Sequence, residues 1–134
     1  PGVYSTYGYI VKAAKGKAEI ETIPGIPCFC AAAAMANKPL VEKNEVLSII
    51  PMNADDVQIN QVVSCSDAMV FMKVYKREER LIHIIEEQNI TGDSYFALRC
   101  GFEDAQIKDD TRKALQENKD YLSVVHTRRK PSDG

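Results

Sequence analysis

The residue whose type and position best suit ligand binding is Lys73, which follows the apolar run Ala68–Met72. An uninterrupted apolar run bounded by polar residues is typical of a strand that is buried on both faces of a sheet. Ligands of open α/β sheets gather beyond the carboxyl ends of the strands, and an ammonium group there can hold a carboxylate or a phosphate. The alternative is a solvated lysine that connects this strand to the next helix.

A second candidate is the turn Ile23–Cys30, which contains the sequence Pro-Gly-Ile-Pro and runs into a stretch of alanines. Before it, residues 18–23 alternate small or apolar with charged side chains, which predicts a strand. The alanines favour a helix, and Pro27 suits its first position because the missing N–H is one that a helix leaves unpaired. The first amides of this helix would carry a partial positive charge and attract a polar ligand. An ordinary strand-to-helix connection would have the same pattern.

No motif in the sequence identifies a catalytic centre by itself. There is no glycine-rich dinucleotide-binding loop or P-loop, no His-Glu-x-x-His helix and no Gly-x-Ser-x-Gly turn. His83 falls within a predicted helix, where a surface or half-buried side chain is expected. His126 falls in a predicted strand and would line a pocket only if that strand ended at one. The sequence therefore assigns no catalytic residue.

Composition and charge are those of one domain with its own core. The chain has 134 residues, of which 45% are hydrophobic and 27% charged, which is ordinary for a globular domain. The net charge of −2 disfavours binding to nucleic acid or anionic lipid. No stretch approaches the roughly 18 consecutive apolar residues of a membrane span, and no secretory signal opens the sequence. We therefore expect a cytoplasmic protein without a membrane segment.

The cysteines do not suggest a metal site. They lack a Cys-x-x-Cys pair, and two of them are too close together for an easy disulfide. We expect no bound metal and small buried thiols in a cytosolic protein. The four residues are Cys28, Cys30, Cys65 and Cys100.

Periodicity and turn residues predict an α/β fold with a mixed sheet of about five strands flanked by helices. Helices are expected over residues 7–15, 27–36, 55–63 and 76–88, and strands over residues 18–23, 45–50, 68–72, 95–100 and 121–126. Residues 106–119 are ambiguous, with helical character from 110 to 117 after a start that suits an edge strand. A single domain is expected over residues 1–130, with Arg128-Arg129-Lys130 solvated and residues 131–134 as a flexible tail.

Three stretches in register resemble motifs of the tetrapyrrole (corrin/porphyrin) methylases. Residues 1–7, Pro-Gly-Val-Tyr-Ser-Thr-Tyr, are similar to the continuation of the family's Gly-Asp-Pro-x-x-Tyr-Ser motif. Residues 23–29, with the alanines and Pro39-Leu40, look like the second motif. Together with Met72-Lys73-Val74-Tyr75 they resemble one branch, the precorrin-2 (cobalt-factor II) C-20 methyltransferases. Because the sequence opens at Pro1, just after the Gly-Asp position, we expect a fragment of a longer protein.

The resemblance implies a methyltransferase of cobalamin biosynthesis, which uses S-adenosylmethionine to methylate C-20 of precorrin-2 or cobalt-factor II. Members of the family have two α/β domains with the cofactor in the cleft between them, and they are usually homodimers. This chain resembles the second domain. The missing N-terminal domain would supply a glycine-rich loop, the Gly-Asp pair and much of the tetrapyrrole trough, so the fragment alone is expected to be inactive.

By resemblance, six residues contact S-adenosylmethionine or its product S-adenosylhomocysteine. Lys73 replaces a residue that is often methionine in the family, and two of the others belong to a turn that commonly meets the adenosine end. The six are Val3, Pro27, Cys28, Lys73, Cys100 and Gly101. Two alternatives stay open: another tetrapyrrole methylase or a related diphthamide or ribosomal-RNA methylase, and a non-catalytic α/β binding or dimerisation module. The negative net charge disfavours the RNA enzyme.

Overall fold

A computed structural model of the chain describes residues 2–129. The predicted flexible tail, residues 131–134, lies outside the described residues, as do Pro1 and Lys130. Within residues 2–129, no helix has both the length and the apolar composition to cross a lipid bilayer.

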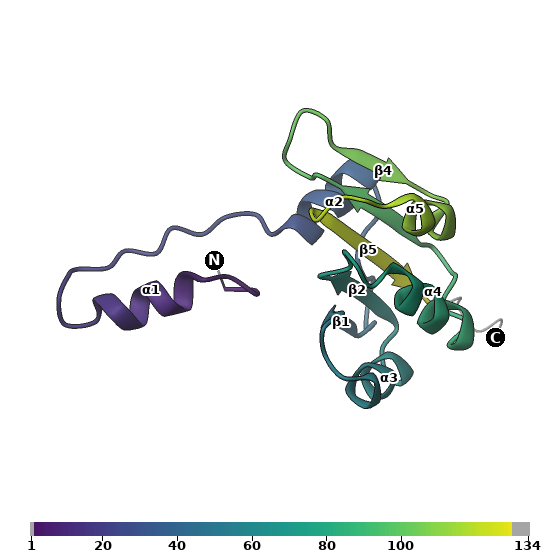
Figure 1. The fold of residues 1–134 in the computed structure, drawn as a ribbon, viewed down its shortest axis with the longest axis horizontal. Helices are drawn as coiled ribbons and strands as arrows, with labels where there is room; N and C mark the ends of the chain where they lie inside the picture. Colours follow the sequence, from purple (N-terminus) through teal and green to yellow (C-terminus); the bar gives the residue numbers. More distant parts are fainter. Residues whose placement is uncertain (1, 130–134) are drawn as a thin grey trace.

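Five strands form one mixed sheet in the order β1-β2-β5-β3-β4, drawn in Figure 1. They are β1 (Leu47–Pro51), β2 (Ala68–Met72), β3 (Tyr95–Leu98), β4 (Gln106–Lys108) and β5 (Ser123–Arg128). β1 and β2 are parallel, whereas the pairs β2–β5, β5–β3 and β3–β4 are antiparallel. The predicted mixed sheet of five strands with flanking helices is confirmed.

Helices cover both faces of this sheet (Figure 1). The larger core lies between one face and the helices α3 (Asp56–Ser64), α4 (Glu78–Glu87) and α5 (Thr111–Glu117). On the opposite face, α2 (Cys28–Ala36) packs through Phe29 and Ala32. Because successive strand residues point to opposite faces, β2 contributes Phe71 to the first core and Val70 to the second. Its burial on both sides agrees with the sequence prediction.

Local sequence explains where these helices begin and end. Asp55 Oδ1 accepts a hydrogen bond from the backbone N–H of Gln58 (2.9 Å) and so caps α3. Pro27 is the residue before α2 rather than its first helical residue. At the other end of α2, Asn37 adopts a left-handed conformation (φ 52°), which asparagine tolerates better than most residues. The ambiguous stretch 106–119 contains both predicted elements, the edge strand β4 and then α5.

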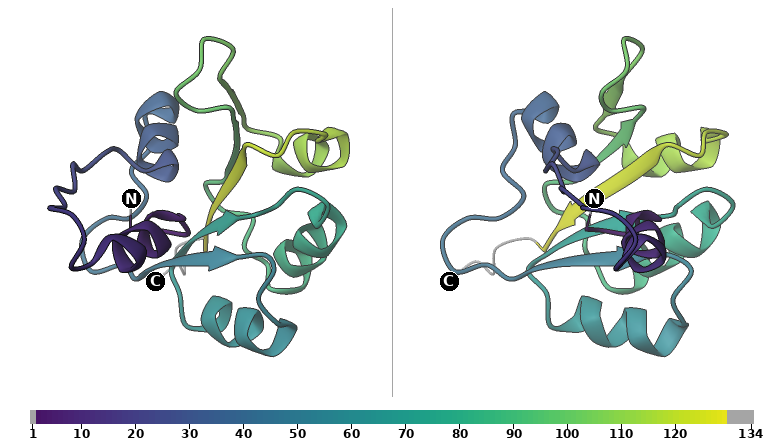
Figure 2. Two further views of the ribbon diagram at one scale, coloured as in Figure 1. Left: turned by 60° about the vertical axis from the view of Figure 1, so that its left-hand side comes forward. Right: turned by 90° about the vertical axis from the view of Figure 1, so that its left-hand side faces the viewer.

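The first part of the chain forms an arm, which we define as residues 2–27. It contains α1 (Tyr7–Ala14), none of whose residues is buried, and it extends away from the sheet in Figure 1. The left view of Figure 2 shows the chain after α1 returning to the start of α2. The predicted strand 18–23 is wrong for this structure, because the segment has no neighbouring strand to complete its hydrogen bonds. β4 is the fifth strand in its place.

The last strand also differs from its prediction. β5 extends to Arg128, whereas the sequence placed its end at residue 126. The Arg128 side chain is only 13% exposed and forms ion pairs with Glu42 (3.1 Å) and Glu45 (2.6 Å). Arg129 donates hydrogen bonds to backbone carbonyls, among them Ser66 O at 2.9 Å. The prediction of solvated side chains is therefore wrong for both arginines.

Candidate functional site

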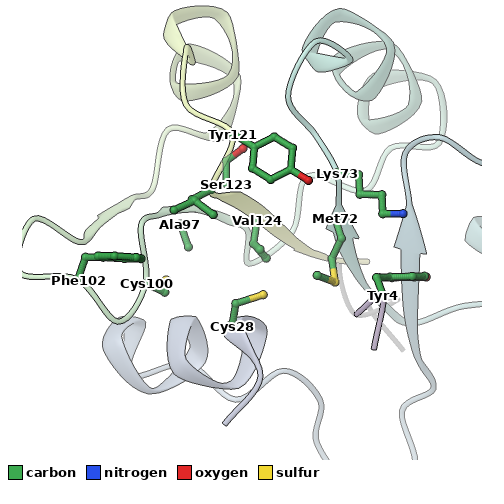
Figure 3. A pocket seen from close by; sticks show the side chains of 11 residues that line it. Tyr4, Cys28, Met72, Lys73, Ala97, Cys100, Phe102, Tyr121, Ser123 and Val124 are labelled. Carbon is green, nitrogen blue, oxygen red and sulfur yellow. The ribbon is translucent and has the colours of Figure 1, made fainter. Parts of the chain in front are cut away.

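A hollow of about 180 Å³ lies at the end of the sheet where β2 and β3 finish and β5 begins. These ends coincide because β5 runs antiparallel to both neighbours. We call this hollow the sheet-end pocket; Figure 3 shows the side chains that surround it. They are Tyr4, Cys28, Met72, Lys73, Ala97, Cys100, Phe102, Tyr121, Leu122, Ser123 and Val124.

A second hollow of about 250 Å³ adjoins the first between the arm and α2. The two hollows share Cys28 and Met72. We call the second one the arm hollow; it is lined by Val3, Gly25, Ile26, Pro27, Cys28, Phe29 and Met72. Each is smaller than the roughly 300–1,000 Å³ of a typical small-molecule pocket, and both are partly open to solvent. The two together form a concave wall rather than an enclosed site.

Five of the six residues that the sequence assigned to a cofactor site line these hollows. Val3 and Pro27 line the arm hollow, and Cys28 lines both. Lys73 and Cys100 line the sheet-end pocket. The sixth, Gly101, follows Cys100 in the chain but is not among the lining residues. The fold thus brings together residues that are up to 97 positions apart, from Val3 to Cys100.

Lys73 has an unusual local geometry. It follows β2 as predicted, with φ 57°, and its Nζ lies 5.0 Å from the centroid of the Tyr4 ring. Tyr4 also has a positive φ (49°), and its hydroxyl donates a hydrogen bond to Ile49 O (3.3 Å) on the free edge of β1. Such conformations are uncommon outside glycine and cluster at functional sites. Among the described lining residues, Lys73 is the only one with a formal charge.

Three exposed aromatic residues at the pocket were missed by the sequence as ligand-binding candidates. Tyr4, Phe102 and Tyr121 keep 47%, 53% and 69% of their surface exposed, although large aromatic side chains are usually buried. Tyr121 is steadied by an edge-to-face contact with Tyr75, with ring centroids 6.2 Å apart. Nothing in a single sequence distinguishes these aromatics from core residues. Their grouping around one hollow suits a planar ligand.

The cysteines of the pocket are not activated nucleophiles. Burial raises the pKa of Cys28 and of Cys100 above the ordinary thiol value, so both stay protonated at neutral pH. Cys30 and Cys65 are exposed, which corrects the expectation of buried thiols; the other two are only half-buried. Within residues 2–129 no three His, Cys, Asp or Glu side chains are grouped so as to hold a metal ion.

Neither histidine lies in the pocket. His126 is 1% exposed on β5, where its Nε2 lies 3.0 Å from Leu40 O and its ring lies 5.0 Å from that of Tyr95. His83 is exposed on α4, as the sequence predicted, and its Nδ1 lies 3.8 Å from a carboxylate oxygen of Glu87. The described lining residues therefore contain no histidine and no carboxylate. They suit the binding and orientation of a ligand better than nucleophilic attack on it.

Sequence comparisons identify relatives for most of the chain. Residues 1–116 match the family profile described as Tetrapyrrole (Corrin/Porphyrin) Methylases. A Methanocaldococcus jannaschii protein named "Probable cobalt-precorrin-2 C(20)-methyltransferase" is 31% identical over 135 residues, covering 96% of this chain and 55% of the relative. The Salmonella typhimurium cobalt-precorrin-2 C(20)-methyltransferase is 28% identical over 88 residues, covering 66% and 37% respectively. The chain thus spans about half the length, or less, of these curated relatives.

Solved structures share the fold. The Thermus thermophilus uroporphyrin-III C-methyl transferase, whose crystal structure is a complex with S-adenyl homocysteine, matches with a TM-score of 0.70 and 11% identity. The match covers 95% of this chain and 61% of that one. The methyltransferase CobJ matches with a TM-score of 0.68 and 21% identity, covering 96% and 61%. These likenesses confirm the predicted fold class.

Proposed function

The chain belongs to the tetrapyrrole (corrin/porphyrin) methylases, and on that premise we propose that it is the second half of an S-adenosylmethionine-dependent C-methyltransferase. The proposed reaction is methylation of C-20 of precorrin-2 or cobalt-factor II in cobalamin biosynthesis. The names of the two curated relatives above support the position and the substrate class. Four free cysteines fit a reducing cytoplasm, and we propose a homodimer as the working form.

The observation that carries the proposal is that residues of the turn 23–30 and residues at the ends of β2 and β3 line adjoining hollows. Pro27 and Cys28 lie at the start of α2, where unpaired backbone amides favour a polar ligand, and Lys73 and Cys100 lie across the adjoining pocket. S-adenosylmethionine combines an adenine ring, a sulfonium and a carboxylate. The aromatic side chains of this wall fit the adenine ring, and its single ammonium fits the carboxylate.

The lining residues account for the chemistry by positioning. When bound, S-adenosylmethionine supplies an electrophilic methyl group, so the protein needs no nucleophile of its own. Lys73 would hold a carboxylate, and the aromatic side chains would hold a planar ring. Correct orientation of two reactants is worth about 7–11 kcal/mol of the barrier. Methylation of a ring carbon also releases one proton, which a base must accept; among the described residues no histidine or carboxylate lines the sheet-end pocket, and we assign no base.

We propose that the arm joins this domain to a preceding domain that supplies the rest of the cleft. α1 buries no residue, and Ile20, Ile23 and Ile26 keep 42%, 75% and 81% of their surface exposed. Apolar surface on this scale usually marks an interaction site. The relatives are about twice as long as the chain, which supports a partner of similar size. The chain by itself is then expected to lack methyltransferase turnover.

The test is calorimetric titration of S-adenosylhomocysteine into this chain and into the longer protein that the proposal requires. Binding by both means that this domain carries most of the cofactor site, and binding by the longer protein alone supports a divided cleft. In whichever form binds, Lys73→Gln should weaken affinity. Lys43→Gln should not, although Lys43 is also a lysine with a left-handed backbone (φ 51°). An absence of binding by both proteins would contradict the methyltransferase assignment.

The second candidate is methylation of the same class of macrocycle at another position. The structural neighbours support it, because they include proteins named as a uroporphyrin-III methyltransferase and a cobalt precorrin-4 methyltransferase. The longer protein should be incubated with labelled S-adenosylmethionine and precorrin-2, and the product examined by NMR. A methyl group at C-20 supports the first proposal, whereas a methyl group at any other carbon supports the second.

A further inference from the structure

We propose that Arg99 is a positioning residue of the sheet-end pocket. It holds together two loops that carry lining residues of this pocket, and it thereby raises the affinity for S-adenosylhomocysteine without contacting that ligand. The inference rests on the proposed cofactor site. Arg99 directly follows β3 and is not itself a lining residue. The first loop comprises residues 99–105 and the second residues 118–122.

The side chain of Arg99 contacts both loops. Its Nε lies 2.8 Å from Asp104 Oδ2 in the first loop, and its Nη1 lies 3.5 Å from Asp120 Oδ2 in the second. The guanidinium carbon also lies 4.8 Å from the centroid of the Phe102 ring. Arginine suits this role because its planar group can face an aromatic ring while its charge pairs with two carboxylates. A lysine would keep the charge but not this combination.

The backbone of the first loop depends on the same residue. Arg99 has φ 51°, and its N–H donates to Leu122 O in the second loop at 2.9 Å. Its carbonyl accepts from the N–H of Phe102 at 3.1 Å, and Gly101 between them has φ 92°, which glycine adopts without strain. A left-handed arginine that bonds through both backbone and side chain fixes the direction in which Cys100 and Phe102 point.

The second loop is anchored to the body of the domain. Asp120 Oδ1 accepts from the N–H of Leu122 at 2.8 Å, and the Asp120 N–H donates to Asn118 Oδ1 at 3.1 Å. Asn118 Nδ2 in turn donates to Glu78 Oε1, 2.8 Å away at the start of α4. Arg99 therefore connects a projecting loop to a loop that is already held in place.

The lining side chains of these loops have little packing of their own. Phe102 and Tyr121 are 53% and 69% exposed, and Leu122 is 42% exposed. Figure 3 shows Phe102 and Cys100 on one side of the pocket and Tyr121 with Ser123 on another. Burial gives these three side chains little support, whereas the ion pairs of Arg99 join the two loops that carry them.

The first measurement is the rate at which iodoacetamide alkylates Cys100, followed by peptide mass spectrometry. Cys100 neighbours Arg99 and is only half-exposed, whereas Cys65 lies beyond α3 and is exposed. Arg99→Met should raise the Cys100 rate by about three- to tenfold, because local opening exposes the thiol, and should leave Cys65 unchanged. Arg99→Lys should fall between Arg99→Met and wild type. Arg112→Met removes another surface arginine, which pairs with Glu86 away from the pocket, and should have no effect.

The second measurement is the affinity for S-adenosylhomocysteine and for 5′-methylthioadenosine, which keeps the nucleoside but lacks the amino-acid carboxylate. The affinity for both ligands should fall by a similar factor in Arg99→Met, partly recover in Arg99→Lys and stay unchanged in Arg112→Met. Unchanged alkylation, or faster alkylation with unchanged affinity, would overturn the inference. If wild type binds neither ligand in any form, the proposed function fails, while the alkylation rates still decide whether Arg99 holds the wall.

Discussion

His126 is a buried ionisable group that lies outside the pocket lining. Its Nε2 lies against Leu40 O, and its Nδ1 has no hydrogen-bond partner among the described residues. Burial lowers its pKa most, and the positive charges of Arg128 and Lys38 lower it further. The contact with Leu40 O and the charge of Asp93 act in the opposite direction. A histidine held neutral in this way stabilises the fold only while it remains unprotonated.

This predicts a loss of stability in mild acid. Between about pH 7 and pH 5 the unfolded chain binds a proton at His126 that the folded chain binds only at lower pH. The free energy of unfolding therefore decreases as the pH is lowered through this range. His126→Gln, which can still donate to Leu40 O, should remove most of this slope. Thermal unfolding at several pH values measures it, with the exposed His83→Gln as the control. A slope that persists in His126→Gln would refute this account.

At the scale of elements, one side chain organises the ends of two helices. Arg129 donates to Val63 O at 2.5 Å and Ser66 O at 2.9 Å, at the carboxyl end of α3. It also donates to Gln88 O at 3.4 Å, at the carboxyl end of α4. The last carbonyls of a helix lack partners within the helix and carry partial negative charge. A cation that bonds to them supplies the missing donors and compensates the negative charge. The residue that looked like part of a solvated tail is a shared helix cap.

We therefore predict that Arg129→Met lowers the free energy of unfolding by about 2 kcal/mol, the usual loss for hydrogen bonds from a charged donor. Methionine keeps the apolar stem, so the change removes donors rather than packing. Arg112→Met, which breaks an exposed ion pair with Glu86, should cost less than about 0.5 kcal/mol. Urea unfolding followed by circular dichroism compares the two variants. Equal free energies of unfolding for Arg129→Met and Arg112→Met would show that the hydrogen bonds of Arg129 do not stabilise the fold.

At the scale of the whole molecule, the described chain has one part that is stabilised by a buried core and one part that is not. Residues 28–129 contain the sheet and its cores, whereas the arm contains α1 without a buried residue (Figure 1). Isolated helices shorter than about 12–15 residues are marginal in water, and α1 has only 8. The contacts of Tyr4 with Ile49 and Lys73 hold the start of the arm to the body.

Hydrogen exchange should reveal this division. Amides of residues 7–27 should exchange with almost no protection in the chain alone, while those of β2, buried on both faces, should exchange only through global unfolding. In the longer protein of the proposed function, the same arm amides should become protected. Mass spectrometry of peptides from both forms makes the comparison. Strong protection of residues 7–27 in the chain alone would show that the arm needs no partner.

The sequence by itself determined those helices and strands that are specified by neighbouring residues. The apolar run of β2 and the alanines of α2 predicted their elements, because propensity and hydrophobic pattern act within a few residues. The family motifs also predicted six residues that contact one cofactor; five of them line adjoining hollows, Gly101 does not, and the cofactor contact itself stays a prediction.

Only the tertiary structure decided the rest. Residues 18–23 carry a strand pattern, yet a strand requires a partner, and the described chain offers none. The left-handed Lys73 and Arg99, the aromatic side chains around the sheet-end pocket and the helix-capping role of Arg129 all depend on residues distant in sequence. The alternation of apolar and polar side chains along a segment predicts which face is apolar. Whether that face becomes part of the core, a binding site or an interface depends on the elements that pack against it.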